Sequence, residues 1–311
     1  MADKTEIGGL DEEAENSYIK AGRIASSILN FARKIVKPDA PILEIAEKIE
    51  SEIVKLGGRV AFPATVSCDE IAAHNSPLWQ DKTIAFGLVK VDFGVAINGF
   101  ISDNAISFDL SPEQKYAILI KAAESALDNS IKFIKEAKRN GSEVTLGEIG
   151  SKIQEAIALA GFSPVRNLSG HELNQYMVHS GLTIPNYNNE SKTELQDGAY
   201  AIEPFATSGV GVVQDGSPSG IYNLEHVKPV RDSFTRELFK FIQEEYKTLP
   251  FSARWLIKKF GIRALLSLQT LEQQGCLHQF PQLVEKSRMP VSQAEKTILI
   301  SGKKVIVLGE E

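Results

Sequence analysis

The sequence predicts a mixed α/β (α+β) fold, with a central antiparallel sheet and helices outside it. β-branched and aromatic residues flank Asn98–Gly99, a dipeptide that favours a two-residue turn, so residues 88–108 are expected to form an antiparallel hairpin. In addition, a pattern of two helices, a capping glycine, a strand and a histidine occurs twice. The capping glycine and the histidine are Gly57 and His74 in the first copy, and Gly161 and His179 in the second. This repeat indicates two lobes related by pseudo-twofold symmetry.

The first half of the chain is expected to begin with two amphipathic helices. Small and apolar residues recur at helical spacing over residues 11–36. The second helix is expected to begin at Pro41, because proline favours the first helical position, and to end at the capping Gly57. A short strand and a loop that ends at His74 then lead into the hairpin.

The second half is expected to repeat this arrangement. Ser111 and Gln114 frame a capping box with proline at its first helical position, which predicts a helix from there to about Arg139. Thr145 and Glu148 frame another capping box, at the start of a helix that ends at the next glycine. These two helices would cover the second lobe.

The last third of the chain combines strands with a helical insertion. The segments AYAIEPFAT, GVGVVQ and IYNLEHVKPV predict strands, with glycine and Ser-Pro-Ser-Gly turns between them. Residues 231–276 have helical spacing, and strand patterns resume later with PVSQAEKTILI and KKVIVL. Over residues 231–275, eight Lys and Arg against five Asp and Glu give a net charge of +3. These charges are scattered, which favours a solvated face over a nucleic-acid contact.

Composition excludes several classes of protein. With 311 residues and 43% hydrophobic content the chain can bury a large core, and its net charge of −6 argues against a general nucleic-acid or membrane-surface binder. The two cysteines, Cys68 and Cys276, fit a reducing compartment better than a disulfide framework. No apolar run reaches the ~18 residues of a membrane span, and the acidic N-terminus does not resemble a signal peptide. We therefore expect a soluble, cytoplasmic protein without a membrane partner.

The hairpin carries two aspartates on one face. Counting outward from its turn places Asp103 opposite Gly94 and Asp92 opposite Ala105, so that the aspartates are diagonal neighbours about 7–8 Å apart at the backbone. Acids in strands with an otherwise buried pattern require a positive partner. The aspartates are therefore either solvated on a polar outer face or ligands of a dinuclear metal centre.

Three further polar residues stand in similarly apolar surroundings. Glu203 lies within AYAIEPF and Glu295 within VSQAEKTILI, and no Lys or Arg pattern supplies a partner for Glu203. His171 follows a Ser-Gly pair, where a side chain can point into a cleft. Each residue alone could be a salt-bridge partner or a structural histidine. Four acids and a histidine on separate strands favour a metal site.

Five sequence blocks resemble those of a known family. FPATVSCDEIAAH, VKVDFGVAINGFISDNA, NLSGHELNQYMVHSG, AIEPFATSGVGVV and SQAEKT closely resemble, in order and spacing, the signature blocks of type II methionine aminopeptidases. The resemblance covers nearly the whole chain, including the helical insertion that separates type II from type I enzymes. It implies the pita-bread fold, as one catalytic domain over residues 1–311 in a short form without the basic N-terminal extension of eukaryotic relatives.

The resemblance also implies metal-dependent removal of the N-terminal methionine when the second residue is small. The family's five metal ligands have matching residues here: Asp92, Asp103, His171, Glu203 and Glu295. Asp103 and Glu295 would bridge two divalent ions, with His171 and Glu203 completing one site and Asp92 the other. This oxygen-rich set suits Mn, Fe(II) or Co(II), and Zn and Ni also remain open.

Further roles follow from the same resemblance. Glu203 would shuttle the proton of the attacking water, His179 would donate a hydrogen bond to the oxyanion, and His74 would hold the substrate backbone beyond the scissile bond. The substrate's α-amine would bind the metal held by Asp92. The methionine pocket would include Phe62 and Val178, with Phe280 and Ile221 as further candidates.

The chain departs from the family pattern at four positions. Lys296 stands where a histidine usually follows the fifth ligand, and Phe280 stands where relatives carry tyrosine. Ala96 and Asn98 replace the histidine and aspartate that many relatives have in the hairpin. None of the four is a metal ligand, so the departures bear on surrounding hydrogen bonds and on pocket shape.

The expected partners are the N-termini of nascent polypeptides, and the sequence leaves open a transient contact with the ribosome. The protein is expected to be a monomer. Prolidases and X-Pro aminopeptidases share the fold but usually carry an additional N-terminal domain, whereas here the first helix begins near residue 11. A binding protein of this fold that has lost its ligands is another alternative, and the intact ligands argue against it. The third is a structural protein whose basic insertion binds nucleic acid, with an affinity that falls steeply with salt.

Overall fold

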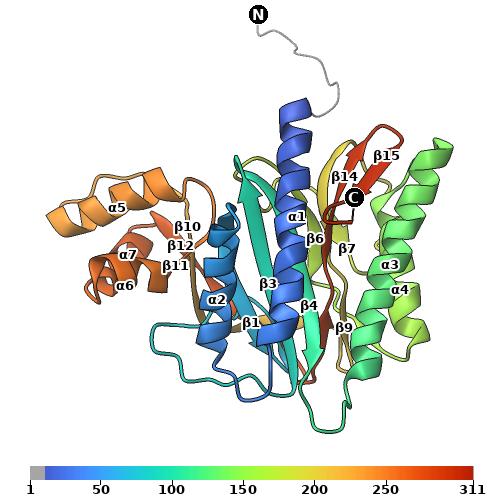
Figure 1. The fold of residues 1–311 in the computed structure, drawn as a ribbon, viewed down its shortest axis with the longest axis horizontal. Coiled ribbons are helices and arrows are strands. Elements are labelled where there is room, and N and C mark those ends of the chain that lie inside the picture. The colour runs from blue at the N-terminus through green and yellow to red at the C-terminus, as the bar shows by residue number, and fades with distance from the viewer. Residues whose placement is uncertain (1–10, 311) are drawn as a thin grey trace, which may run out of the picture.

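The computed structural model describes residues 11–310. Two pairs of helices cover one side of a layer of antiparallel strands (Figure 1). In Figure 1 the first pair lies in front of the central strands and the second pair lies beside it on the right. The helices are α1 (Glu12–Ile35), α2 (Ile42–Lys55), α3 (Ala117–Asn140), α4 (Leu146–Leu159), α5 (Ser233–Glu245), α6 (Ala253–Phe260) and α7 (Ala264–Gln273).

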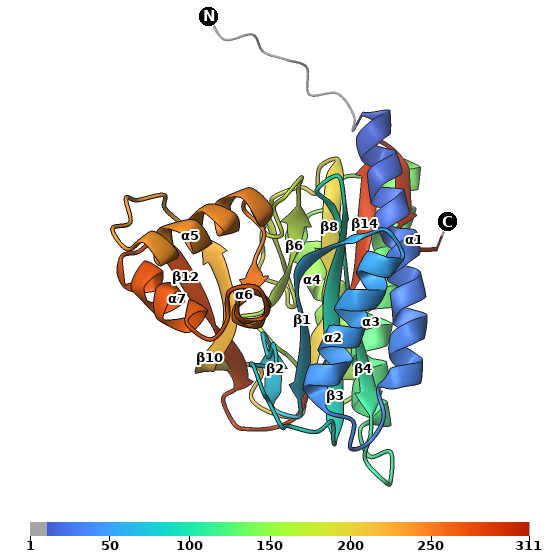
Figure 2. The ribbon, with the colours of Figure 1, turned by 60° about the vertical axis from the view of Figure 1, so that its left-hand side comes forward.

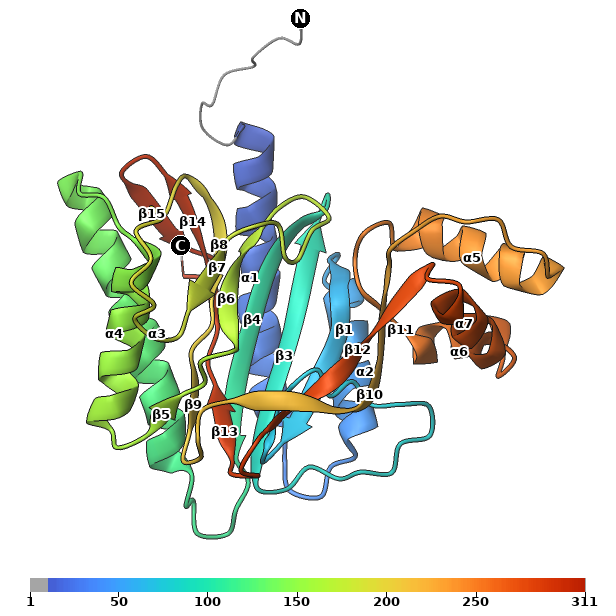
Figure 3. The same ribbon diagram turned by 180° about the vertical axis from the view of Figure 1, so that it is seen from behind.

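Most of the strands lie behind the helices in the view of Figure 1. Figure 3, which shows the molecule from behind, has β10 and β12 crossing the central strands. The strands of the first half are β1 (Arg59–Cys68), β2 (Ile71–Ala73), β3 (Leu88–Ile97) and β4 (Phe100–Asp109). Those of the second half up to the insertion are β5 (Ser163–Pro164), β6 (Ser169–Leu173), β7 (Thr183–Pro185), β8 (Gly198–Ile202), β9 (Phe205–Thr207) and β10 (Val213–Leu224). The last are β11 (Phe251–Ser252), β12 (Leu277–Glu285), β13 (Val291–Gln293), β14 (Lys296–Ser301) and β15 (Lys304–Val307).

The strands are hydrogen-bonded in the orders β1-β3-β4, β11-β10-β12-β2, β13-β9-β5 and β15-β14-β8-β6-β7, and every pair is antiparallel. A bridge between Ala105 and Glu295 joins the hairpin to the strands of the second lobe. The two lobes therefore meet at the centre of the molecule, as the sequence repeat predicted.

The hairpin β3–β4 has the predicted register. Gly94 pairs with Asp103, and Asp92 pairs with Ala105. Asn98 and Gly99 have φ angles of 52° and 88°, the positive values that a two-residue hairpin turn of this kind requires. The two aspartates therefore share one face of the hairpin.

The starts of α2 and α3 differ from the prediction, and the start of α4 is confirmed. α3 begins at Ala117, because Asp109 accepts hydrogen bonds from the backbone and hydroxyl of Ser111, and the positive φ of Gln114 interrupts the helical path. α2 begins one residue later than predicted, with Pro41 as its N-cap. The capping box at the start of α4 forms as predicted.

The C-terminal strands also differ from the prediction. β8 ends at Ile202 and β9 begins at Phe205, so the segment AYAIEPFAT is two strands with a break between them. The expected Ser-Pro-Ser-Gly turn lies within β10, where shifts of register accommodate it. β12 was not predicted, because Pro281 lies in the middle of it, and proline lacks the N–H that a strand ladder uses.

The helices α5, α6 and α7 lie to one side of the molecule, between β10 and β12 in the sequence, and pack on a separate apolar cluster (Figure 2). Arg254 of α6 forms a buried bidentate ion pair with Glu50 of α2. Glu50 also accepts hydrogen bonds from the indole of Trp255 at 2.9 Å and from the backbone N–H of Ala64 in β1 at 3.1 Å. One carboxylate therefore connects α6 to α2 and β1.

Both cysteines are free, as expected. Within residues 11–310, no helix combines the length and the apolar character that crossing a bilayer requires.

Candidate metal centre and pocket

Five side chains of metal-ligand type come from different strands and from segments next to strands. Asp92 and Asp103 lie on β3 and β4, and His171 lies on β6, where it pairs with Ala201 of β8. The other two residues are Glu203, just after β8, and Glu295, between β13 and β14. Sheet pairing thus brings together residues that are up to 203 positions apart, from Asp92 to Glu295.

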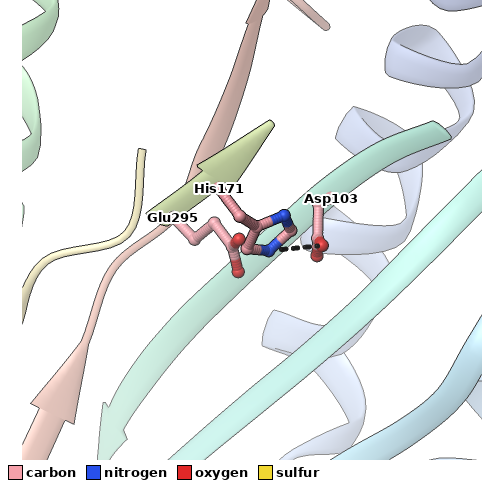
Figure 4. A group of neighbouring side chains, drawn as sticks. All are labelled: Asp103, His171 and Glu295. Atoms are coloured by element: carbon pink, nitrogen blue, oxygen red, sulfur yellow. Dashed lines mark ion pairs between the residues drawn. The ribbon is translucent and has the colours of Figure 1, made fainter. Parts of the chain in front are cut away.

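These side chains form two groups that share Glu295. Potential ligand atoms of Asp103, His171 and Glu295 all lie within 4.8 Å of one another, and so do those of Asp92, Glu203 and Glu295. Figure 4 shows the side chains of the first group converging from three separate segments of chain. Nε2 of His171 lies 3.6 Å from Oδ2 of Asp103.

Several oxygens of these groups are buried without a partner. Asp103 and Glu295 are each 2% exposed. Among the described residues, Oδ1 of Asp92, Oδ1 of Asp103 and both carboxylate oxygens of Glu295 have no hydrogen-bond partner. Buried carboxylate oxygens are normally satisfied, so the orphaned atoms indicate a ligand that is a cation. Four carboxylates and an imidazole fit hard or borderline divalent metal ions.

The electrostatics of the cluster point the same way. Burial raises the pKa of Asp92 to about 7. Burial and the charges of neighbouring carboxylates raise the pKa of Asp103, Glu203 and Glu295 well above the usual range. Burial lowers the pKa of His171 to about 3, so its imidazole is neutral and free to bind a metal at neutral pH. A divalent cation would favour the ionised carboxylates and reverse their shifts.

A cavity of about 470 Å³ opens onto the cluster. Every site residue that the sequence predicted lines this cavity, and so do the two further pocket candidates, Phe280 and Ile221. Its lining includes Asp92, Asp103, His171, Glu203, Glu295, His74, His179, Phe62, Val178, Ile221 and Phe280.

The two remaining histidines are held beside the cluster. The ring of His179 packs edge-on against that of His171, with 4.3 Å between centroids, and burial lowers its pKa. His74 has a φ of 62°, and its Nδ1 lies 3.3 Å from the carbonyl oxygen of Pro281. Burial lowers the pKa of His74 to about 4, so Nδ1–H of the neutral ring donates to this carbonyl and Nε2 is an acceptor.

One of the four departures from the family pattern lines the cavity, and three do not. Lys296 does not line the cavity and forms an ion pair with Glu310. Asn98 Nδ2 donates to Ser17 Oγ at 3.3 Å, away from the cluster. Phe280 lines the cavity and packs against His74, with 5.7 Å between ring centroids. Ala96 pairs with Ile101 within the hairpin and does not line the cavity, so only Phe280 of the four contacts it.

Sequence reasoning missed further residues of the site, among them Pro250 and Gln293. Pro250 lines the cavity from the segment that precedes α6, and nothing in its sequence context indicates that role. Gln293 donates hydrogen bonds to Asp92 and Glu203. It stands two residues before Glu295, so the alternation of side chains along an extended segment was a usable signal.

Comparisons with known proteins agree with this geometry. A sequence model of metallopeptidase family M24 matches residues 16–246. The chain is 39% identical to a methionine aminopeptidase of Methanocaldococcus jannaschii over 296 residues, which cover 94% of this chain and 97% of the relative. It is 41% identical to that of Pyrococcus horikoshii over 300 residues, covering 95% and 99%.

Solved structures share the fold at lower identity. A thermophilic Arx1 superposes with a TM-score of 0.80 at 15% identity, covering 96% of this chain and 91% of that one. A methionine aminopeptidase of Thermotoga maritima gives 0.67 at 20% identity, covering 98% and 100%. The prolidase of Pyrococcus furiosus gives 0.56 at 17% identity, and 97% of this chain matches only 65% of that protein. The chain therefore belongs to metallopeptidase family M24, among the methionine aminopeptidases, and has their pita-bread fold.

Proposed function

We propose that this protein removes the N-terminal methionine from nascent polypeptides whose second residue is small, as a monomer in the cytoplasm. The observation that carries the proposal is the convergence of four carboxylates and one imidazole, with orphaned buried oxygens, at the wall of one cavity. Membership among the methionine aminopeptidases supports the choice of reaction.

The five converging residues would hold two divalent ions. Glu295 belongs to both groups of potential ligands and is suited to be shared. The family resemblance would make Asp103 the second shared ligand, with His171 and Glu203 on one side and Asp92 on the other, whereas the potential ligand atoms of Glu203 group here with those of Asp92. Divalent ions at such a site supply a hydroxide nucleophile at neutral pH and polarise the carbonyl under attack. Mn, Co and Fe(II) match the oxygen-rich donor set best.

The chain's own residues would perform the remaining steps. Glu203 would accept the proton that the attacking water loses and deliver it to the leaving amine. His179 would donate a hydrogen bond to the oxygen on which negative charge develops. Nε2 of His74 is an acceptor, so it would bind a backbone N–H of the substrate beyond the scissile bond.

The cavity also explains selection of the substrate. Phe62 and Val178, with Ile221 and Phe280, give it an apolar wall that suits a methionine side chain. Asp92 lies on the charged side of the cavity, where the substrate's free α-amino group would be attracted. Only the first residue of a polypeptide offers this amino group, which restricts cleavage to the N-terminus.

Peptide cleavage tests the proposal directly. Protein stripped of metal and reloaded with Mn²⁺ or Co²⁺ should release methionine from Met-Ala-Ser and spare Met-Lys-Ser, and the stripped protein should cleave neither. The metal content of the reloaded protein should be measured in the same sample. Absence of methionine release with every tested metal, in protein that has bound the metal, would overturn the proposal.

A further inference from the structure

Gln293 is buried at the end of β13, directly beside the candidate metal centre. Gln293 is 1% exposed. Its amide nitrogen lies 2.7 Å from Oε1 of Glu203 and 3.2 Å from Oδ2 of Asp92. A side-chain amide nitrogen carries two hydrogens, and here each hydrogen has one carboxylate as its acceptor.

This arrangement joins two acids that come from different strands. Asp92 lies on β3 and Glu203 follows β8, and these two strands are not neighbours in any sheet. Within residues 11–310, no other side chain donates a hydrogen bond to the carboxylate group of any of the four candidate acid ligands. Gln293 is thus a neutral donor among mutually repelling carboxylates, and charge-assisted hydrogen bonds of this kind are short and strong.

The backbone of Gln293 is itself fixed. The hydroxyl of Ser107 in β4 accepts a hydrogen bond from the N–H of Gln293 at 2.9 Å and donates one to its carbonyl oxygen at 2.7 Å. Gln293 also pairs with Phe205 across β13 and β9. With its backbone held on both sides, the amide can impose a position on the two carboxylates.

We propose that Gln293 is a positioning residue that fixes the spacing of Asp92 and Glu203, and thereby sets the affinity of the site for divalent metal. Its hydrogen bonds use one oxygen of each carboxylate and leave Oδ1 of Asp92 buried without a protein partner, available to a metal. The inference rests on the metal centre of the proposed function and assigns to it a residue that is not a ligand.

Metal binding to the stripped protein tests this role. Gln293→Met keeps the length and volume of the side chain and removes both hydrogens, so binding of Mn²⁺ measured by titration calorimetry should weaken ~10–100-fold, the usual effect of losing a residue that orients ligands. The matched control is Ser292→Ala, which removes a buried hydrogen bond to Leu119 from the next residue of β13. That variant should bind Mn²⁺ within about threefold of the parent protein.

A second readout reports on geometry instead of affinity. At saturating Co²⁺ the visible absorption bands of Gln293→Met should differ from those of the parent, because the two carboxylates are no longer held together, whereas Ser292→Ala should keep the parent spectrum. Ser107→Ala, which loosens only the backbone of Gln293, should weaken Mn²⁺ binding in the same direction by a smaller factor. It provides the test if Gln293→Met does not fold.

The outcomes separate the two proposals. Suppose that the parent protein binds Mn²⁺ and that Gln293→Met binds it equally well, with an unchanged Co²⁺ spectrum. The role of Gln293 is then refuted and the metal centre stands. If Gln293→Met does not fold, the same result for Ser107→Ala refutes the role. If the parent protein binds neither metal, the proposed function itself is refuted, and the role of Gln293 with it.

Discussion

The buried ion pair between Glu50 and Arg254 gives the sharpest test of how the insertion is attached. Glu50→Ala would leave a guanidinium that is 1% exposed without its counter-ion. It would also remove the acceptor of the Trp255 indole and of the Ala64 N–H. Removing one partner of a buried pair costs about 3–5 kcal/mol, because the remaining charge stays buried.

The assay is unfolding by urea and by heat. With an unfolding entropy of about 2.1 cal/mol/K per residue, a loss of about 4 kcal/mol corresponds to a decrease in Tm of roughly 6 °C for a chain of this length. Fluorescence is a suitable probe because the chain has two tryptophans, of which Trp255 contacts Glu50 itself. The variant should also show a larger change in KM than in kcat, since Pro250, just before α6, lines the cavity.

A double variant supplies the control. Glu50→Met with Arg254→Met removes both charges and fills the space with apolar atoms, a replacement that is often neutral or stabilising for buried pairs. We expect it to recover the stability that the unpaired buried charge costs in either single variant, but not the part lost with the acceptor of the Trp255 indole and the Ala64 N–H. A loss below about 1 kcal/mol in Glu50→Ala, or a double variant that is no more stable than the worse single one, would show that the two residues are not coupled.

Three further predictions concern the site. Asp103→Asn should abolish release of methionine from Met-Ala-Ser while circular dichroism stays unchanged, and an unaltered rate would exclude Asp103 as a shared ligand. His179→Ala should lower kcat about 10²–10³-fold with little change in Mn²⁺ affinity, because it removes a donor to the oxyanion; an equal loss of metal affinity would contradict that role. Because the pKa of Asp92 is raised to about 7, the folded metal-free protein binds more protons than the unfolded chain between about pH 4 and 7. The contribution of Asp92 to stability is therefore lost as the pH rises through 7. Mn²⁺ should raise the Tm strongly near pH 7.5 and much less near pH 5. An increase in Tm that does not depend on pH would contradict this prediction.

Local sequence was sufficient for the parts of the fold that depend on near neighbours. The Asn98–Gly99 turn sets the register of the hairpin, since the turn conformation and the two-residue alternation leave one pairing. The capping box of Thr145 and Glu148 satisfies backbone groups within one turn of helix, so it could also be predicted. The box at Ser111 does not form, because Asp109, outside the pattern, accepts the hydrogen bonds of the backbone N–H and the hydroxyl of Ser111.

The candidate site was predicted by resemblance, and its chemistry depends on contacts that no local pattern contains. Sequence blocks named the residues now found around one cavity. They did not reveal that Gln293 joins Asp92 to Glu203, because that contact links strands about 90 and 200 residues apart in the chain. β12 was missed for a related reason: its pairing with β10 and β2 tolerates Pro281 in a position that its own sequence disfavours.

The sequence by itself determined which side chains are the candidate ligands, where the hairpin turns, and that acids stand among apolar neighbours. Only the tertiary structure decided that these acids share one buried space, with oxygens that no other part of the described chain satisfies. The physical reason is that the pKa of a carboxylate and its affinity for a cation depend on solvent exclusion and on nearby charge. Both arise when distant strands pair, and neither is a property of a residue and its sequence neighbours.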